Sequence, residues 1–178
     1  MIETERLILR TWSDADREPY AALNADPRVG DWLGGVRTKA QTDAAIDRFN
    51  AGIARSGYGF FAAERKADGR LVGMIGVDRF APGEMPFGEA VEMAWRLSPD
   101  SWGAGLASEG AAAVLAWSWA RVDDPEIVAI TAQANLRSQA VMRRIGMTPD
   151  PTRAFDHPKL AADHPLRRHV LFSARRPA

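Results

Sequence analysis

Residues 93–107 read Met-Ala-Trp-Arg-Leu-Ser-Pro-Asp-Ser-Trp-Gly-Ala-Gly-Leu-Ala. This stretch predicts the end of a β-strand over residues 89–97, a glycine-containing turn, and a helix over residues 104–120. The two glycines allow the backbone to approach a ligand closely, and the first N–H groups of a helix favour an anion. We therefore expect a phosphate to bind at the turn. A tight strand-to-helix turn without any ligand explains the glycines equally well.

Other phosphate-binding and hydrolytic motifs do not fit this turn. It lacks the Gly-Lys-Ser/Thr of a P-loop, and the next glycine, Gly110, lies too far along for a dinucleotide fingerprint. The chain has no Gly-x-Ser-x-Gly elbow, which argues against an α/β-hydrolase triad.

The rest of the chain alternates strands and helices without a linker or repeat. Ala67-Asp68-Gly69 predicts the turn of a β-hairpin, and the segment between Asp26-Pro27 and Thr38 is glycine-rich and predicts a loop. We expect strands at residues 6–11, 58–64, 71–77, 89–97, 127–131 and 169–173, and helices at residues 13–24, 38–55, 104–120 and 138–145.

The composition bounds the class of protein. The 178 residues predict a single domain, 1–178, and the 23 basic and 23 acidic residues balance, so we expect neither nucleic acid nor a membrane as partner. The absence of cysteine excludes disulfides and thiol chemistry, and three late histidines make a metal site improbable. The acidic first residues do not resemble a signal peptide, which favours a cytoplasmic location. A homodimer is compatible with the sequence.

Three motifs, taken in order along the chain, resemble one known family. They are Glu5-Arg6-Leu7-Ile8-Leu9-Arg10, Trp95-Arg96-Leu97-Ser98-Pro99 running into Trp102-Gly103-Ala104-Gly105-Leu106-Ala107-Ser108-Glu109, and Asn135-Leu136-Arg137-Ser138 with Arg144-Ile145-Gly146-Met147. The chain resembles the GCN5-related N-acetyltransferases (GNAT), in the branch that includes the ribosomal-protein N-terminal (alanine/serine) acetyltransferases. It departs from the general pattern at Trp102, where the family has Gln or Arg, and thereby lacks one polar contact to the pyrophosphate.

The resemblance implies an α+β fold, with a mostly antiparallel central sheet flanked by helices and acetyl-CoA held between two splayed strands, residues 89–97 and 127–134. It implies an acetyl-CoA-dependent transfer of an acetyl group to a primary amine, and no metal. The cofactor contacts that it implies are the amides near Met93 and Ala94, the turn formed by Trp102, Gly103, Ala104, Gly105, Leu106 and Ala107, and the side chain of Asn135.

The residues that handle protons are harder to assign. The resemblance implies that Ser138 protonates the departing thiolate, although Ser138 and Asn135 also suit the start of a helix. Glu92 is our first candidate for the base that deprotonates the amine; a solvated carboxylate, or one paired with Arg96 or Arg79, is the alternative. Asp156 and His157, in a proline-rich loop, come second and suit ordinary loop roles at least as well.

Two further assignments follow from position. Trp32 lies in the predicted loop where the family builds a wall of the acceptor pocket, and it serves either there or as an apolar plug. Arg137, Arg143 and Arg144 suit the 3′-phosphate of the cofactor, with a solvated helix face as the alternative. The acceptor is either a protein or peptide N-terminus or a small amine such as a polyamine, amino acid or aminoglycoside. A non-catalytic acyl-CoA-binding module is the rival outside the enzymes.

Overall fold

One mixed sheet organises the chain. The computed structural model describes residues 1–177, and its strands follow the order β1-β2-β3-β4-β5-β6-β9-β7, with β8 pairing β9. Every neighbouring pair is antiparallel except β5 and β6, which are parallel. The strands are β1 (Ile2–Glu3), β2 (Leu7–Arg10), β3 (Phe60–Arg65), β4 (Arg70–Arg79), β5 (Val91–Leu97), β6 (Glu126–Ala132), β7 (Thr148–Pro149), β8 (Phe155–Asp156) and β9 (Arg168–Arg175).

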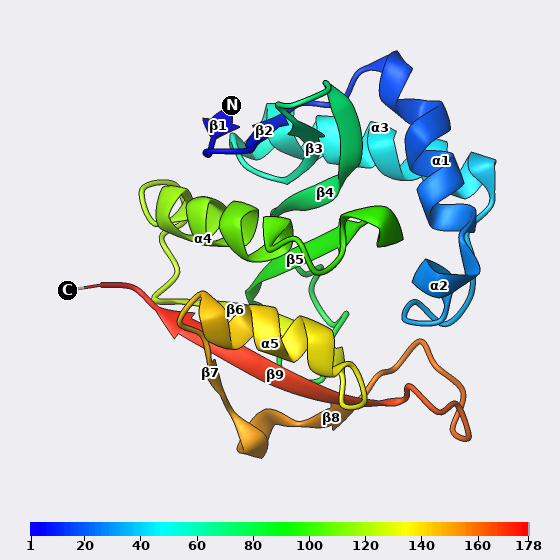
Figure 1. The fold of residues 1–178 in the computed structure, drawn as a ribbon. Helices are drawn as coiled ribbons and strands as arrows, with labels where there is room; N and C mark the ends of the chain where they lie inside the picture. The colour runs from blue at the N-terminus through cyan, green and yellow to red at the C-terminus, as the bar shows by residue number, and fades with distance from the viewer. Residues whose placement is uncertain (178) are drawn as a thin grey trace.

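Helices cover both faces of this sheet. They are α1 (Arg17–Ala25), α2 (Pro27–Gly30), α3 (Lys39–Ser56), α4 (Leu106–Ser118) and α5 (Leu136–Arg144), with short 3-10 turns at Asp14–Asp16, Pro99–Ser101 and Pro151–Arg153. Figure 1 shows α4 and α5 side by side in front of the sheet, with α1 and α2 along the right-hand edge. The α+β architecture with a mostly antiparallel sheet is therefore confirmed.

Alternation along the strands separates two cores. On β3 and β4, Phe61 and Ile75 pack with α4 in one buried cluster, whereas their neighbours Ala62 and Met74 pack with α1 and α3 in another. Successive strand residues point to opposite faces of a sheet, so these two clusters lie on opposite sides. On β5, Met93 belongs to the α4 side and Ala94 to the α1 side.

Most of the predicted elements are confirmed, with ends shifted by a few residues. The loop predicted after Asp26-Pro27 is wrong at its start, because α2 occupies Pro27–Gly30. The Asp26 side chain accepts a hydrogen bond from the Arg28 N–H, and proline suits the first helical position, so this pair begins a helix as well as ending one. The short strands β1, β7 and β8 were not predicted; each is only two residues long.

The parallel pair β5 and β6 separates after two residues. Val91 pairs with Ile127 and Glu92 with Val128, and no further pairing follows although β5 continues to Leu97. From Met93 onward, every second N–H group of β5 therefore faces away from β4 without a ladder partner. Among residues 1–177, no helix is long and apolar enough to cross a bilayer.

Candidate active site

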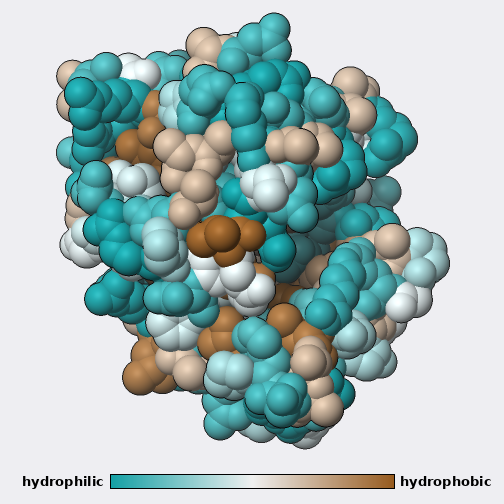
Figure 2. All heavy atoms as spheres, turned by 90° about the vertical axis from the view of Figure 1, so that its right-hand side faces the viewer, coloured by the Kyte–Doolittle hydropathy of each residue, from teal (hydrophilic) through white to brown (hydrophobic). Residues whose placement is uncertain are grey.

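A cleft of about 1380 Å³ opens where β5 and β6 separate. Figure 2 shows the molecule from the right-hand side of Figure 1, with a hollow bordered by apolar and polar patches. The predicted site residues that line this cleft are Trp32, Glu92, Met93, Ala94, Trp102, Gly103, Ala104, Gly105, Leu106, Ala107, Asn135, Ser138, Arg144 and His157. Arg137, predicted for the 3′-phosphate, also lines it, whereas Asp156 and Arg143 do not.

The turn before α4 presents unused backbone donors to the cleft. Gly103 and Gly105 adopt φ values of 77° and 79°, a left-handed conformation that favours glycine. The first backbone bond that enters α4 runs from the Glu109 N–H to the Gly105 carbonyl, at 3.0 Å. In the described part of the chain, the N–H groups of residues 103–108 donate to no other backbone group, and the Trp102 indole instead donates to the Leu97 carbonyl at 2.8 Å. Such a run of free donors at a helix start suits an anion.

Arg6, near the N-terminus of the chain, forms hydrogen bonds that hold this turn. Its Nη1 donates to the Ala104 carbonyl at 2.9 Å and its Nε to Glu109 Oε2 at 2.6 Å. Glu109 also accepts from the Arg6 N–H and from the Thr4 hydroxyl. The sequence analysis quoted Arg6 within a family motif without giving it a site role, and no local pattern could link it to a turn about a hundred residues later.

Glu92 lies on the α1 side of β5, on the same face as Ala94. Burial, and then the negative charges of Glu84 and Asp78, raise its pKa to about 8. The ion pairs expected as the alternative do not form, because Arg79 pairs with Asp124 and Arg96 donates to Asn24. Glu92 is therefore a carboxylate in the cleft whose pKa suits proton transfer near neutral pH.

Asn135, and not Ser138, is the N-cap of α5. The Asn135 side chain caps α5, since its Oδ1 accepts the Ser138 N–H at 3.1 Å. Ser138 is thus a first-turn residue and not the N-cap. Its hydroxyl forms no hydrogen bond within residues 1–177 and lines the cleft, which leaves it available to a ligand.

The two candidate bases in the C-terminal loop, Asp156 and His157, have different surroundings. Asp156 is exposed and lies within 3.4 Å of Arg167 Nε and Arg168 Nη1, outside the cleft. The alternation of β8 explains this, because Phe155 takes the buried side. His157 does line the cleft, and burial together with the nearby His169 lowers its pKa to about 4. It is uncharged at neutral pH and a weaker base than Glu92.

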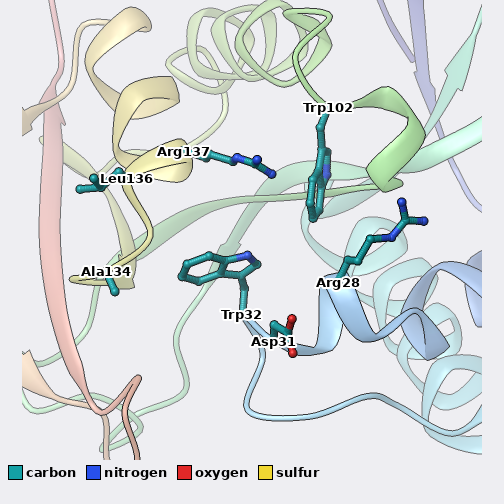
Figure 3. A pocket seen from close by; sticks show the side chains of 7 residues that line it. All are labelled: Arg28, Asp31, Trp32, Trp102, Ala134, Leu136 and Arg137. Carbon is teal, nitrogen blue, oxygen red and sulfur yellow. The ribbon is translucent and has the colours of Figure 1, made fainter.

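A smaller pocket shares Trp32, Trp102 and Arg137 with the cleft, and Arg28 and Asp31 also line it. Figure 3 shows Trp32 between Ala134 and Leu136 on one side and Trp102 and Arg28 on the other, with Arg137 extending toward Trp102. The Arg137 guanidinium lies 5.2 Å from the centre of the Trp102 ring. Arg137 and Arg144 line the cleft, whereas Arg143 lies over the Phe172 ring. His169, which was not among the predicted site residues, also lines the cleft.

The chain is similar to known acetyltransferases in sequence and in fold. The family model "Acetyltransferase (GNAT) domain" matches residues 6–148. An FsC-acetyl coenzyme A-N(2)-transacetylase from Aspergillus fumigatus is 28% identical over 151 residues, which cover 83% of this chain and 64% of that protein. A solved acetyltransferase from Agrobacterium tumefaciens superposes with a TM-score of 0.77 at 27% identity, covering 98% and 93% of the two chains.

A ribosomal L7/L12 alpha-N-protein acetyltransferase, solved in complex with coenzyme A, shares the fold. Its TM-score is 0.75 at 16% identity, and the match covers 97% of this chain and 95% of that one. The matched region holds β5, the turn before α4 and the start of α5, which are the elements that form the cleft. The chain therefore belongs to the GNAT acetyltransferase family.

Proposed function

We propose that this protein transfers the acetyl group of acetyl-CoA to a primary amine that enters the cleft from the α1 side of the sheet. The observation that carries the proposal is one cleft that joins a run of free N–H donors at residues 103–108 to the partly buried carboxylate of Glu92. The first suits a diphosphate and the second suits a base, so both ends of the reaction have a place.

The lining of the cleft suits acetyl-CoA. The turn before α4 would hold its diphosphate, and the edge of β5 that β6 leaves free would offer N–H groups near Met93 and Ala94 to the thioester carbonyl. Arg144, and beside it Arg137, suit the 3′-phosphate as charge-assisted donors.

Proton movement follows from the side chains that face the cleft. An amine is mostly charged near neutral pH and must lose a proton before its nitrogen can attack the thioester carbon. Glu92 accepts that proton, directly or through one water. As the new C–N bond forms and the C–S bond breaks, the Ser138 hydroxyl protonates the departing thiolate, and the second proton that the nitrogen releases restores the Ser138 hydroxyl through solvent. Trp32 forms a wall of the acceptor entrance.

The acceptor is a protein or peptide N-terminus or a small amine. Among the relatives, one is named for an N(2) position and another for the α-amino group of a ribosomal protein, so the family relationship alone leaves both classes open. A non-catalytic acyl-CoA-binding module would not require the carboxylate at Glu92. The cytoplasmic location, the homodimer and the single-domain boundary remain predictions.

Thiol release from acetyl-CoA, measured against a panel of amines and N-terminal peptides, tests the proposal. We expect at least one primary amine to be acetylated, with the product confirmed by mass spectrometry. Binding of acetyl-CoA without acetylation of any amine would favour the non-catalytic module.

A further inference from the structure

The charged side chains that line the cleft are mostly basic. Glu92 is the single carboxylate in the lining, considered over residues 1–177, whereas the cations are Arg37, Arg96, Arg137, Arg144 and Lys159. The Lys159 ammonium is neutralised by Glu84 at 2.6 Å. Arg137 and Arg144 belong to α5, at the end of the cleft where we propose that the cofactor binds. Two cations, Arg37 and Arg96, thus remain without an assigned anion.

Arg96 faces the side of the sheet from which the acceptor enters. It follows Ala94 at the alternate position of β5, and its Nη1 donates to Asn24 Oδ1 of α1 at 2.6 Å. Its Nε is buried and has no hydrogen-bond partner, and no carboxylate of residues 1–177 forms an ion pair with it. A buried guanidinium without a counter-ion is unfavourable, so this group is suited to an anion that arrives with a ligand.

Asn24 also contacts the backbone of Arg37. Asn24 is fully buried, and its backbone carbonyl accepts the Arg37 N–H at 2.9 Å while its side chain holds Arg96. The Arg37 guanidinium donates to the Leu33 carbonyl at 3.0 Å and likewise forms no ion pair in the described chain. Arg37, through its backbone, and Arg96, through its guanidinium, thus both contact Asn24, and both side chains line the cleft without an ion pair in the described chain.

We infer that the amine accepted by this enzyme carries a carboxylate, and that Arg96 binds this carboxylate with support from Arg37. The inference rests on the proposed acetyl transfer and names the class of acceptor: a small molecule of amino-acid type. Because Asn24 occupies Nη1 of Arg96 and Nε is buried, Nη2 is the donor that remains for a carboxylate oxygen in the cleft.

The spacing of the strand suits such a molecule. Glu92 and Arg96 lie on one face of β5 with their Cα atoms about 13 Å apart, and their side chains shorten that gap. An acceptor lying along the strand places its amine near Glu92 and its carboxylate near Arg96. Apolar side chains that line this part of the cleft, Val29, Leu33, Phe60 and Met74, surround the body of the molecule. A polycation would meet two unpaired guanidiniums and only one carboxylate.

Matched pairs of acceptors test the inference in the wild-type protein. We would measure kcat/KM with acetyl-CoA for L-phenylalanine against phenethylamine, and for ε-aminocaproate against n-hexylamine, with spermidine as the polycation. In at least one pair we expect the carboxylate to raise kcat/KM by about tenfold or more, the scale of charge-assisted hydrogen bonds. Spermidine should be the poorest acceptor. Equal rates within both pairs, or a preference for spermidine, would overturn the inference and leave acetyl transfer standing.

Variants locate the preference. Arg96→Gln should bring the ratio within the responsive pair to about one, and Arg96→Lys, which retains the charge on a shorter and differently shaped side chain, should give an intermediate ratio. Arg70→Gln, which makes the same change at an exposed hairpin position, should keep the wild-type ratio. An unchanged ratio in a folded Arg96→Gln protein would overturn the role of Arg96. If no amine is acetylated while coenzyme A binds, the proposed function fails and this inference falls with it.

Discussion

Replacement of Glu92 by glutamine removes the proposed base with almost no change in shape. The pKa of about 8 means that only about a tenth of the molecules carry the carboxylate near pH 7. In the wild type, kcat/KM should therefore rise about tenfold from pH 7 to a plateau above pH 8. Glu92→Gln should lower the plateau by about 10²-fold or more and abolish the rise that Glu92 causes.

The assay is the initial rate of thiol release across this pH range, with the best acceptor of the panel. Asp156→Asn is the matched control, because it makes the same carboxylate-to-amide change outside the cleft and should keep the wild-type profile. His157→Ala separates the second candidate base. Full activity of Glu92→Gln, with a loss in His157→Ala, would refute the reasoning and move the base to the C-terminal loop.

Three more predictions concern the turn, the thiolate and stability. Arg6→Ala removes the hydrogen bond to the Ala104 carbonyl and should raise the KM for acetyl-CoA about tenfold. The KM for S-acetylpantetheine, which lacks the diphosphate, should hardly change. Equal effects on the two KM values would contradict the role of Arg6. Ser138→Ala should lower kcat about tenfold or more at an unchanged melting temperature, because Asn135 caps the helix; a lower melting temperature with normal turnover would indicate a structural role. Because the pKa of Glu92 is raised in the folded protein, its neutral form stabilises the fold below the pKa that Glu92 has in the unfolded chain, and this contribution is lost as the pH rises through about 8. Glu92→Gln should therefore raise the melting temperature at high pH but not near pH 4. Equal shifts of the melting temperature at the two pH values would contradict the assigned pKa.

Local sequence chemistry predicted most of the elements and the glycine turn before α4. The glycines of residues 103–105 and the strong helix formers after them require only short-range geometry, and the turn occurs where the pattern placed it. The resemblance to the GNAT family, drawn from the sequence motifs, was confirmed by the family model that matches residues 6–148. Asn135 and Ser138 could not be separated from sequence, because either residue type caps a helix and only the backbone angles decide which one does.

Other features depend on contacts that a local pattern does not contain. The divergence of β5 and β6 after Glu92 is set by how helices and strands pack around both strands, and Arg6 reaches its turn across the sheet. Asp156 and His157 are adjacent in sequence, yet one is exposed and the other lines the cleft, because the register of β8 on β9 places neighbours on opposite sides. The basic character of the acceptor side appears only when α1 and β5 are brought together.

The central claim is that the turn before α4 holds the diphosphate of acetyl-CoA, and a calorimetric titration with coenzyme A tests it most directly. Gly105→Glu places bulk and negative charge among the free N–H groups, while Gly69→Glu makes the same change at another left-handed glycine, in the β3–β4 hairpin turn. We expect saturable binding to the wild type and to Gly69→Glu, and no measurable binding to a folded Gly105→Glu protein. Wild-type affinity in folded Gly105→Glu would contradict it.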